Sequence, residues 1–357
     1  MVTGKIKVLV IDDSAVIRAL LSEILNSAGD IEVVGTAQDP IFAKAKLASL
    51  QPDVITLDVE MPRMDGLTFL EELMRTNPTP VLMVSSLTQR ACDTTLRALE
   101  LGAIDYVTKP SIDISQGVEA LAGEIISKVR IAAKARIRRL LPGGGIPPAT
   151  PQQTGRATTL DTTRMATTDK LIAIGASTGG TQAINEVITQ LPSSVPGIVI
   201  VQHMPPVFTK SYAERLNSMS RVRVKEAEHG DRILRGTVFI APGGRHMSIR
   251  RDGAMYYLEL TDGPPVNYVK PAVDVLFRSV ARFAGKNAVG VLLTGMGDDG
   301  ARGLKEMREH GALTIAQDEA SCVVFGMPKR AIELEAVDRI LPLSQISRHL
   351  LEMLQAQ

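Results

Sequence analysis

The chain has few aromatic side chains and few cysteines. Tryptophan is absent and aromatic residues make up 3% of the 357 positions, which argues against a surface that stacks nucleic-acid bases. Cys92 and Cys322 are too few for a disulfide framework, and a reducing compartment suits them. We therefore expect a cytoplasmic protein that does not bind nucleic acid.

An excess of one charge and long apolar runs are also missing. The net charge is +1, so no overall field draws the chain toward nucleic acid or a membrane. No apolar run reaches the length of a membrane span, and the N-terminal residues lack the pattern of a signal peptide. A length of 357 residues with 45% apolar and 22% charged positions predicts two globular domains and no direct membrane insertion.

Short apolar runs alternate with helical patterns from residue 5 to about residue 130. The runs lie at 5–11, 31–35, 54–57, 81–84 and 106–107. Repeated strand–helix units with apolar strands predict a parallel sheet covered by helices on both faces. Ligands of such sheets gather at the carboxyl ends of the strands.

A basic segment and a polar segment follow this first half. Residues 128–139 carry six basic side chains and no acidic one. We interpret them as the solvated face of the last helix, with a contact to an acidic partner as the alternative. Residues 141–169 are rich in Pro, Gly, Thr and Gln and predict a flexible linker. The expected division is 1–127, 128–169 and 170–357.

The alternation resumes from residue 170. Apolar runs at 171–174, 198–202, 221–225, 238–241, 288–293, 313–316 and 339–341 predict strands. Two further runs, 246–250 and 255–260, flank the dipeptide Asp252-Gly253 and predict a β-hairpin. We expect a doubly wound, mostly parallel α/β sheet that carries an antiparallel pair.

Carboxylates follow two of the runs in the first half. Asp12 and Asp13 come directly after the first run, and Asp58 follows the third. Strand ends of a parallel sheet converge, so these carboxylates repel one another and Mg²⁺ would relieve the repulsion. With Ser85 and Lys109 at the next strand ends, the set can accept a phosphoryl group. Helix capping by the aspartates is the alternative, and it does not account for the whole set.

Four motifs in this half resemble a known family, namely VLVIDDS, ITLDVEMPRMDG, MVSSLT and GAIDYVTKP. Through them residues 5–125 resemble the receiver domain of bacterial response regulators, a (βα)5 fold that a histidine kinase phosphorylates. The resemblance implies that Asp58 is the phospho-acceptor, and that Mg²⁺ is held by Asp12, Asp13, Asp58 and the backbone carbonyl of Glu60. It implies supporting roles for Ser85, Tyr106 and Lys109, and Pro110 allows a cis peptide bond after Lys109.

The second half contains a serine in a glycine-rich turn. Gly175, Ser177 and Gly179 match Gly-x-Ser-x-Gly between an apolar run and a helical pattern. A serine held at a strand-to-helix turn is exposed as a nucleophile. A glycine-rich turn that binds phosphate at a helix N-terminus is the alternative.

A base and an orienting acid are available for this serine. His203 ends the next strand and is the first candidate for the base, while His246 is the second. Asp298 and Asp299 lie near a helix N-terminus that favours an ionised carboxylate, although one of them could simply cap that helix. Their glycine-rich segment offers backbone N–H groups for an oxyanion hole, at Gly295, Gly297 and Gly300.

The chain order Ser…His…Asp differs from that of the α/β-hydrolases. Residues 170–350 instead resemble the catalytic domain of the chemotaxis protein-glutamate methylesterases. The motifs that carry this resemblance are AIGASTGG, VIVQHMPP, FIAPGGRHM, LLTGMGDDGA and DEASCVVFGMPKRA. It implies Ser177 as the nucleophile, His203 as the base and Asp299 as the orienting acid. It further implies that the N–H of Met296 binds the oxyanion and that Thr178 lines the site.

The two resemblances together predict a phosphorylation-activated serine hydrolase. The implied reaction is demethylation of glutamyl methyl esters, with deamidation of glutamines, on methyl-accepting chemoreceptors. The implied phosphodonor is a chemotaxis histidine kinase, and no cofactor is expected at the esterase site. A receiver-linked DNA-binding regulator and a non-enzymatic phosphate- or nucleotide-sensing domain are the other classes considered. The first would need a small basic helix-turn-helix module, which the second half lacks.

Overall fold

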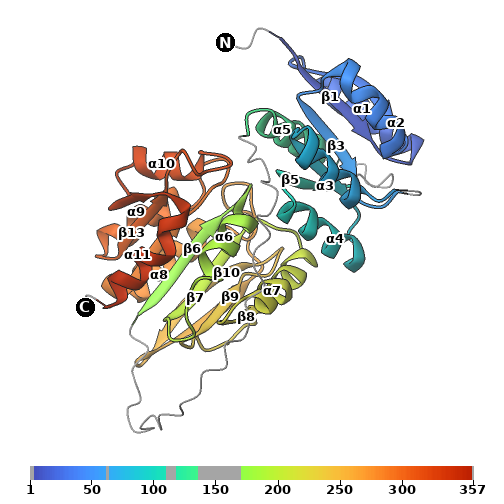
Figure 1. Cartoon of the computed structure of the whole chain (residues 1–357). Coiled ribbons are helices and arrows are strands. Elements are labelled where there is room, and N and C mark those ends of the chain that lie inside the picture. The colour runs from blue at the N-terminus through green and yellow to red at the C-terminus, as the bar shows by residue number, and fades with distance from the viewer. Residues whose placement is uncertain (1–3, 62–63, 110–117, 136–169, 356–357) are drawn as a thin grey trace.

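The computed structural model describes residues 4–61, 64–109, 118–135 and 170–355. These residues form two α/β units, each built on its own parallel sheet, and the units lie against each other (Figure 1). Most of the expected linker, residues 136–169, lies outside the described residues, as does Pro110 with its peptide bond.

The first unit has a five-stranded parallel sheet in the order β2-β1-β3-β4-β5. Every residue of β3 and β4 is buried, as expected for strands covered on both faces. The strands are β1 (Ile6–Ile11), β2 (Ile31–Ala37), β3 (Val54–Asp58), β4 (Val81–Ser85) and β5 (Asp105–Thr108). The helices are α1 (Ala15–Ser27), α2 (Pro40–Leu50), α3 (Gly66–Thr76), α4 (Gln89–Glu100) and α5 (Val118–Ala132).

The second unit has a seven-stranded parallel sheet in the order β14-β13-β12-β6-β7-β9-β8. All its neighbouring strands are parallel. The strands are β6 (Leu171–Ala176), β7 (Gly197–Gln202), β8 (Arg223–Glu226), β9 (Thr237–Ile240), β12 (Ala288–Leu292), β13 (Leu313–Gln317) and β14 (Arg339–Leu341). The sequence therefore predicted the strands of both sheets correctly, with ends that differ by one or two residues.

Alternate residues of the central strands pack into two different cores. Ile172 and Ile174 of β6 belong to the same core as residues of α6 (Gly180–Ile188), α7 (Phe208–Met219) and α11 (Leu343–Gln355). Leu171 and Ala173 instead share a core with residues of α8 (Val273–Phe283), α9 (Ala301–Glu309) and α10 (Met327–Glu333). This alternation is why an uninterrupted apolar strand can carry helices on both faces.

The predicted hairpin forms, but it is a separate sheet. β10 (His246–Asp252) and β11 (Met255–Thr261) form a two-stranded sheet, from His246↔Thr261 to Asp252↔Met255, and Tyr257 of β11 also makes an isolated bridge to Arg232. The expectation that the main sheet carries this pair is therefore wrong. The hairpin instead packs on α8 and closes the second core, where Met247, Ile249 and Leu258 are buried.

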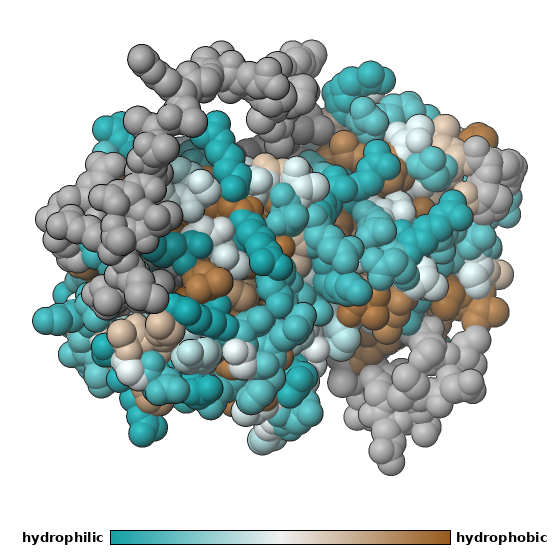
Figure 2. Space-filling view, turned by 90° about the horizontal axis from the view of Figure 1, so that it is seen from below, coloured by the Kyte–Doolittle hydropathy of each residue, from teal (hydrophilic) through white to brown (hydrophobic). Residues whose placement is uncertain are grey.

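The two units contact each other through one face of each unit. Buried residues of α4 and β5 belong to the same continuous core as buried residues of α6 and α7. Elsewhere, the surface in Figure 2 is mostly hydrophilic, with hydrophobic residues in small separate patches. Within the described parts of the chain, no helix combines the length and apolar character that a membrane span requires.

Candidate active site

Three neighbouring strands bring Ser177, His203 and Asp299 together. Ser177 directly follows β6, His203 directly follows β7, and Asp299 lies in the loop between β12 and α9. Because β12 and β7 flank β6 in a parallel sheet, their carboxyl ends meet at one edge. The structure thus places all three sequence-predicted residues in one site.

The backbone of the Ser177 turn is held from two sides. The Ser177 N–H donates to the carbonyl of Thr294 at 3.0 Å, and the Ser177 carbonyl accepts from Gly180 N–H at 2.7 Å. Gly179 has φ 75°, and a Cβ at this position would lie 2.6 Å from Val323. Glycine is therefore required here by conformation and by space, which explains the Gly-x-Ser-x-Gly pattern.

The His203 ring joins the serine to the acid. Its Nδ1 lies 3.1 Å from Ser177 Oγ, and its Nε2 lies 2.8 Å from Asp299 Oδ2. A carboxylate only accepts hydrogen bonds, so the tautomer that pairs with Asp299 carries its proton on Nε2. Nδ1 is then left with a lone pair that can take the proton of the Ser177 hydroxyl.

Asp299 receives more hydrogen bonds than the one from His203. Its carboxylate accepts from Val273 N at 2.6 Å, from Asp274 N at 3.1 Å and from Asn267 Nδ2 at 2.8 Å. Burial opposes ionisation of this group, but these donors and His203 outweigh it and hold the pKa of Asp299 below its ordinary value. Asp299 is therefore a carboxylate fixed in orientation.

The alternative candidates from the sequence lie elsewhere. His246 is buried, its Nδ1 accepts from Ala272 N at 3.2 Å, and its Nε2 pairs with the carbonyl of Pro264 at 2.9 Å. Both ring nitrogens are thus used to hold the backbone. Asp298 is exposed, and its carbonyl accepts from Ala301 N–H in the first turn of α9. Among the described residues, neither His246 nor Asp298 makes a hydrogen bond or ion pair with Ser177 or His203.

Two further predicted residues flank the serine. Thr178 is buried, and its hydroxyl donates to Asp105 Oδ2 of the first unit at 2.6 Å. Met296 is half-exposed, and its sulfur lies 3.3 Å from the hydroxyl of Ser127. Of the three glycines considered for the oxyanion hole, Gly295 already donates its N–H to the carbonyl of Val324 at 3.1 Å.

A second group of predicted residues meets at the carboxyl ends of β1 and β3. Carboxylate oxygens of Asp12, Asp13 and Asp58 all lie within 4.8 Å of one another. Lys109 Nζ lies 2.7 Å from Asp58 Oδ2 and 3.2 Å from Asp12 Oδ2. A divalent cation fits this set, because the oxygens are hard ligands and one lysine does not balance three carboxylates.

The environment of Asp58 disfavours its charge. Burial and the neighbouring charge of Asp12 raise the pKa of the Asp58 carboxyl to about 6, although the contact with Lys109 works in the opposite direction. The N–H of Glu60 lies 3.2 Å from Asp58 Oδ1. An added cation or proton would relieve the repulsion between the Asp58 and Asp12 carboxylates.

Ser85 and Tyr106 do not point at Asp58 in this conformation. The Ser85 hydroxyl accepts from Thr95 Oγ1 of α4 at 2.8 Å and donates to the carbonyl of Ser86 at 3.1 Å. The Tyr106 ring is buried and stacks on Phe208 of α7, with centroids 4.4 Å apart and planes 14° apart. Its hydroxyl has no hydrogen-bond partner among the described residues.

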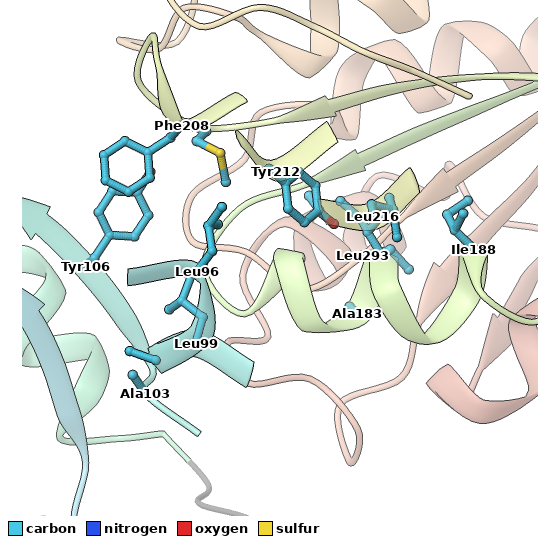
Figure 3. Packing of buried hydrophobic residues seen from close by; sticks show 14 of the residues in the cluster. Leu96, Leu99, Ala103, Tyr106, Ala183, Ile188, Phe208, Tyr212, Leu216 and Leu293 are labelled. Carbon is cyan, nitrogen blue, oxygen red and sulfur yellow. The ribbon is translucent and has the colours of Figure 1, made fainter. Parts of the chain in front are cut away.

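The Tyr106–Phe208 stack belongs to a broad contact between the units. Figure 3 shows the two rings face to face, with Leu96 and Leu99 of α4 nearby. The polar contacts around it are Gln89–Ser211, Gln182–Leu99, Arg215–Glu100 and Thr178–Asp105. The β5 side of the first unit therefore covers the Ser177 turn and the start of α7.

Two groups in the site were not anticipated from the sequence. Asn267 reaches Asp299 from a turn far from it in the chain, and the N-terminal N–H groups of α8 donate to the same carboxylate. The dipole expected from α9 is thus supplemented by α8. The one sequence signal for the turn at Asn267 is that asparagine readily adopts a positive φ, which is 52° here.

Comparisons with known proteins agree with both units. Residues 8–122 match the family model of the response regulator receiver domain, and residues 172–350 match that of the CheB methylesterase. The chain is 56% identical over 363 residues to a protein-glutamate methylesterase/protein-glutamine glutaminase of Geobacter metallireducens, covering 100% of this chain and 98% of that protein. It is 55% identical over 353 residues to the protein of that name from Salmonella typhimurium, covering 99% and 98%.

A solved structure extends this similarity to the fold. The Thermotoga maritima CheB methylesterase catalytic domain is 42% identical with a TM-score of 0.51, covering 52% of this chain and 98% of that one. The two relatives named above match this chain over 100% and 99% of its length, so the sequence similarity covers both units. The chain therefore belongs to the CheB methylesterase family, with a response regulator receiver domain ahead of the catalytic domain.

Proposed function

We propose that this enzyme hydrolyses glutamyl methyl esters on chemoreceptors, with Ser177 as nucleophile, His203 as base and Asp299 as the orienting acid. The observation that carries the proposal is the pair of hydrogen bonds at His203, 3.1 Å to Ser177 Oγ and 2.8 Å to Asp299. A nucleophile, a base and an oriented acid in hydrogen-bond reach are the parts that acyl transfer requires.

The reaction proceeds in two steps. His203 Nδ1 takes the proton of Ser177 as Oγ attacks the γ-carbonyl carbon, and the proton then passes to the leaving methoxide, which departs as methanol. Water next attacks the acyl-enzyme and gives a proton to His203, which passes it to Ser177 Oγ as the acyl bond breaks, so the glutamate side chain is released and the serine is restored. Asp299 keeps the ring in the productive tautomer and stabilises the imidazolium that forms in each step.

Two neighbours complete the catalytic machinery. The backbone N–H of Met296 binds the oxyanion of the tetrahedral intermediate, and Thr178 lines the site beside the nucleophile. Preorganised donors of this kind contribute about 10²–10³-fold to turnover in acyl transfer. A glutamine side chain reacts by the same route with ammonia as the leaving group, in keeping with the glutaminase named in the relatives.

The receiver domain regulates the esterase through phosphorylation of Asp58. The phosphodonor is a chemotaxis histidine kinase, Lys109 pairs with the phosphoryl oxygens, and Ser85 and Tyr106 change rotamer in response. Asp12, Asp13, Asp58 and the carbonyl of Glu60 would hold Mg²⁺, which would supply positive charge for phosphoryl transfer. The carboxylate cluster and the raised pKa of Asp58 support this assignment.

The domain division and the cellular compartment belong to the same proposal. The receiver occupies residues 1–127, the basic helix end and linker 128–169, and the catalytic domain 170–357. Cys92 and Cys322 are both buried and unpaired, which suits the reducing cytoplasm. In that compartment the enzyme reaches the receptors and the kinase without inserting into the membrane. Limited proteolysis should cut first within 136–169 and release two stable fragments.

An active-site label tests the esterase assignment. A fluorophosphonate probe should modify the wild-type chain at Ser177, and Ser177→Ala should lose both labelling and ester hydrolysis. Ser347→Ala is the matched control, because Ser347 is a buried serine whose hydroxyl bonds Gln190 away from the site. If Ser177→Ala keeps more than a few per cent of wild-type turnover, the assignment is wrong.

A further inference from the structure

Gln202 links the backbones of the nucleophile and the base. It is the last residue of β7, directly before His203, and its side chain is 4% exposed. Its Nε2 donates to the carbonyl of Ser177 at 2.9 Å and lies 3.3 Å from the carbonyl of His203. One amide group therefore contacts the main chain of both residues without touching their reactive atoms.

This link begins where the sheet stops. The β6–β7 register ends with the pair Ala176↔Gln202, and His203 N–H donates to the carbonyl of Ala176 at 3.2 Å. Ser177 and His203 lie one residue beyond that pair. The Gln202 amide adds a cross-strand hydrogen bond at this level and so restrains the distance between the Ser177 and His203 backbones. The 3.1 Å contact between Ser177 Oγ and His203 Nδ1 depends on that distance.

The surroundings of Gln202 hold its side-chain amide but leave one polar atom of the amide without a partner. The Gln202 Oε1 is buried without a hydrogen-bond partner among the described residues. A Cβ at Gly180 would lie 2.1 Å from that oxygen and 2.7 Å from the Cβ of Ala176, so the side chain packs closely against the first residue of α6. A buried oxygen without a hydrogen-bond partner lowers stability, and an apolar side chain at position 202 would not have this cost. The presence of glutamine therefore indicates a role for its Nε2 donor.

We propose that Gln202 is a positioning residue that holds the Ser177 turn and the His203 backbone at the separation needed for proton transfer. The inference rests on the roles proposed above for Ser177 and His203. Small errors in the placement of reacting groups reduce turnover strongly, by about a hundredfold for a displacement of 1 Å. Loss of the amide should therefore lower kcat while substrate binding is retained.

Two variants of the full-length chain separate positioning from general stability. Gln202→Met keeps a similar length and removes the donor, and Gln202→Asn keeps an amide that is one methylene too short. For both we expect kcat to fall by about tenfold to a hundredfold with KM within twofold, and the rate of fluorophosphonate labelling to fall in parallel. Ester hydrolysis is measured with the phosphodonor present.

A destabilised variant far from the site is the control. Thr314 is buried at the amino end of β13, and its hydroxyl pairs with Asp338 at 3.0 Å. Thr314→Val should lower the melting temperature and leave kcat within twofold. Wild-type kcat and labelling in Gln202→Met would overturn the inference, and so would a loss of kcat in Thr314→Val that follows its loss of stability.

The two levels of the proposal fail in different ways. If Ser177→Ala remains active, the proposed nucleophile is wrong and the role of Gln202 falls with it. If Ser177→Ala is inactive and Gln202→Met has wild-type kcat, only the role of Gln202 is wrong. An inactive Ser177→Ala together with a Gln202→Met that loses kcat at unchanged KM supports both.

Discussion

Asp298 and Asp299 are adjacent carboxylates in opposite environments. Asp298 is exposed at the start of α9, whereas Asp299 is buried and accepts four hydrogen bonds, from His203, Asn267 and the first two N–H groups of α8. Burial of a carboxylate is tolerated only when donors satisfy it. The difference between the two residues is therefore one of partners and not of chemistry.

This difference predicts different effects of the same substitution. Asp299→Asn should lower kcat by about 10³–10⁴-fold, because an amide no longer fixes the His203 tautomer or stabilises its charged form. Asp298→Asn is the matched control and should leave kcat within twofold. Steady-state kinetics on a small methyl ester checks both. A larger loss in Asp298→Asn would show that the acid had been assigned to the wrong neighbour.

At the scale of single elements, the turn at 266–269 supports the site from a distance. Val266 and Val269 exchange two backbone hydrogen bonds, at 3.1 and 3.0 Å, and the two central residues both have positive φ, 52° at Asn267 and 65° at Tyr268. This is the geometry of a tight type I′ turn. It aims the Asn267 amide at Asp299 and Asp274 and leaves Tyr268 fully exposed.

A pair of glycine substitutions separates these two roles of the turn. Asn267→Gly keeps a residue that accepts positive φ but removes the donor to Asp299, so we expect kcat to fall by about tenfold. Tyr268→Gly makes the same kind of change at a position that does not contact Asp299, and kcat should stay within twofold. Equal kcat losses in both variants would attribute the effect to the backbone of the turn.

Strand ends also define the proposed phosphorylation site. Asp12, Asp13 and Asp58 converge because β1 and β3 are neighbours in a parallel sheet. We expect a small phosphodonor to phosphorylate the chain only with Mg²⁺ present, and Asp58→Asn to abolish the reaction while basal esterase activity remains. Asp53→Asn, which changes an exposed aspartate before the amino end of β3, is the control.

Intact-mass measurement of the added phosphoryl group is the readout. Chelation of Mg²⁺ should abolish the mass increase in the wild type, and Asp53→Asn should behave as the wild type. A phosphoryl group mapped to Asp12 or Asp13 would contradict the assignment of Asp58 as acceptor.

At the scale of the whole molecule, the receiver lies against the proposed catalytic site. Asp105 accepts a hydrogen bond from Thr178 next to Ser177, and Tyr106 stacks on Phe208. Ser85, whose hydroxyl bonds Thr95 of α4, connects the Asp58 region to this face. A change of rotamer at Ser85 and Tyr106 on phosphorylation would therefore act directly on the contact between the domains.

A charge swap tests whether this contact restrains the enzyme. Arg215 of α7 pairs with Glu100 of α4 through two hydrogen bonds outside the catalytic residues. Arg215→Glu should weaken docking and raise the activity of the unphosphorylated chain on receptors several-fold. Adding Glu100→Arg should restore the pair and return activity toward the wild-type level.

A fragment that contains only the catalytic domain represents an enzyme completely released from the receiver. A fragment that begins at Thr168 should be more active on receptors than the unphosphorylated full chain and should gain nothing from a phosphodonor. Small soluble esters should show a weaker difference, because they need less of the surface uncovered. A fragment less active on receptors than the intact chain would contradict simple occlusion and would indicate that the receiver activates the site or recruits the substrate.

The sequence by itself determined the elements and most of the residues that meet at strand ends. Period-two and apolar patterns are local, so each run of the two sheets could be identified, and parallel order then implied that Asp12 and Asp58, or Ser177 and His203, converge. The glycine-rich turn was equally readable, because the positive φ at Gly179 is a need of the local backbone, whereas its close approach to Val323 is a contact with a distant segment.

Only the tertiary structure decided which groups support these residues. Asn267 and the N-terminus of α8 meet Asp299 from elsewhere in the chain, and Gln202 at the end of β7 reaches the Ser177 carbonyl beside the neighbouring strand β6. Tyr106 faces Phe208 because the two domains dock, and the hairpin is a separate sheet because α8 offers it a face to cover. Such contacts depend on packing between distant segments, which no local pattern of residues encodes.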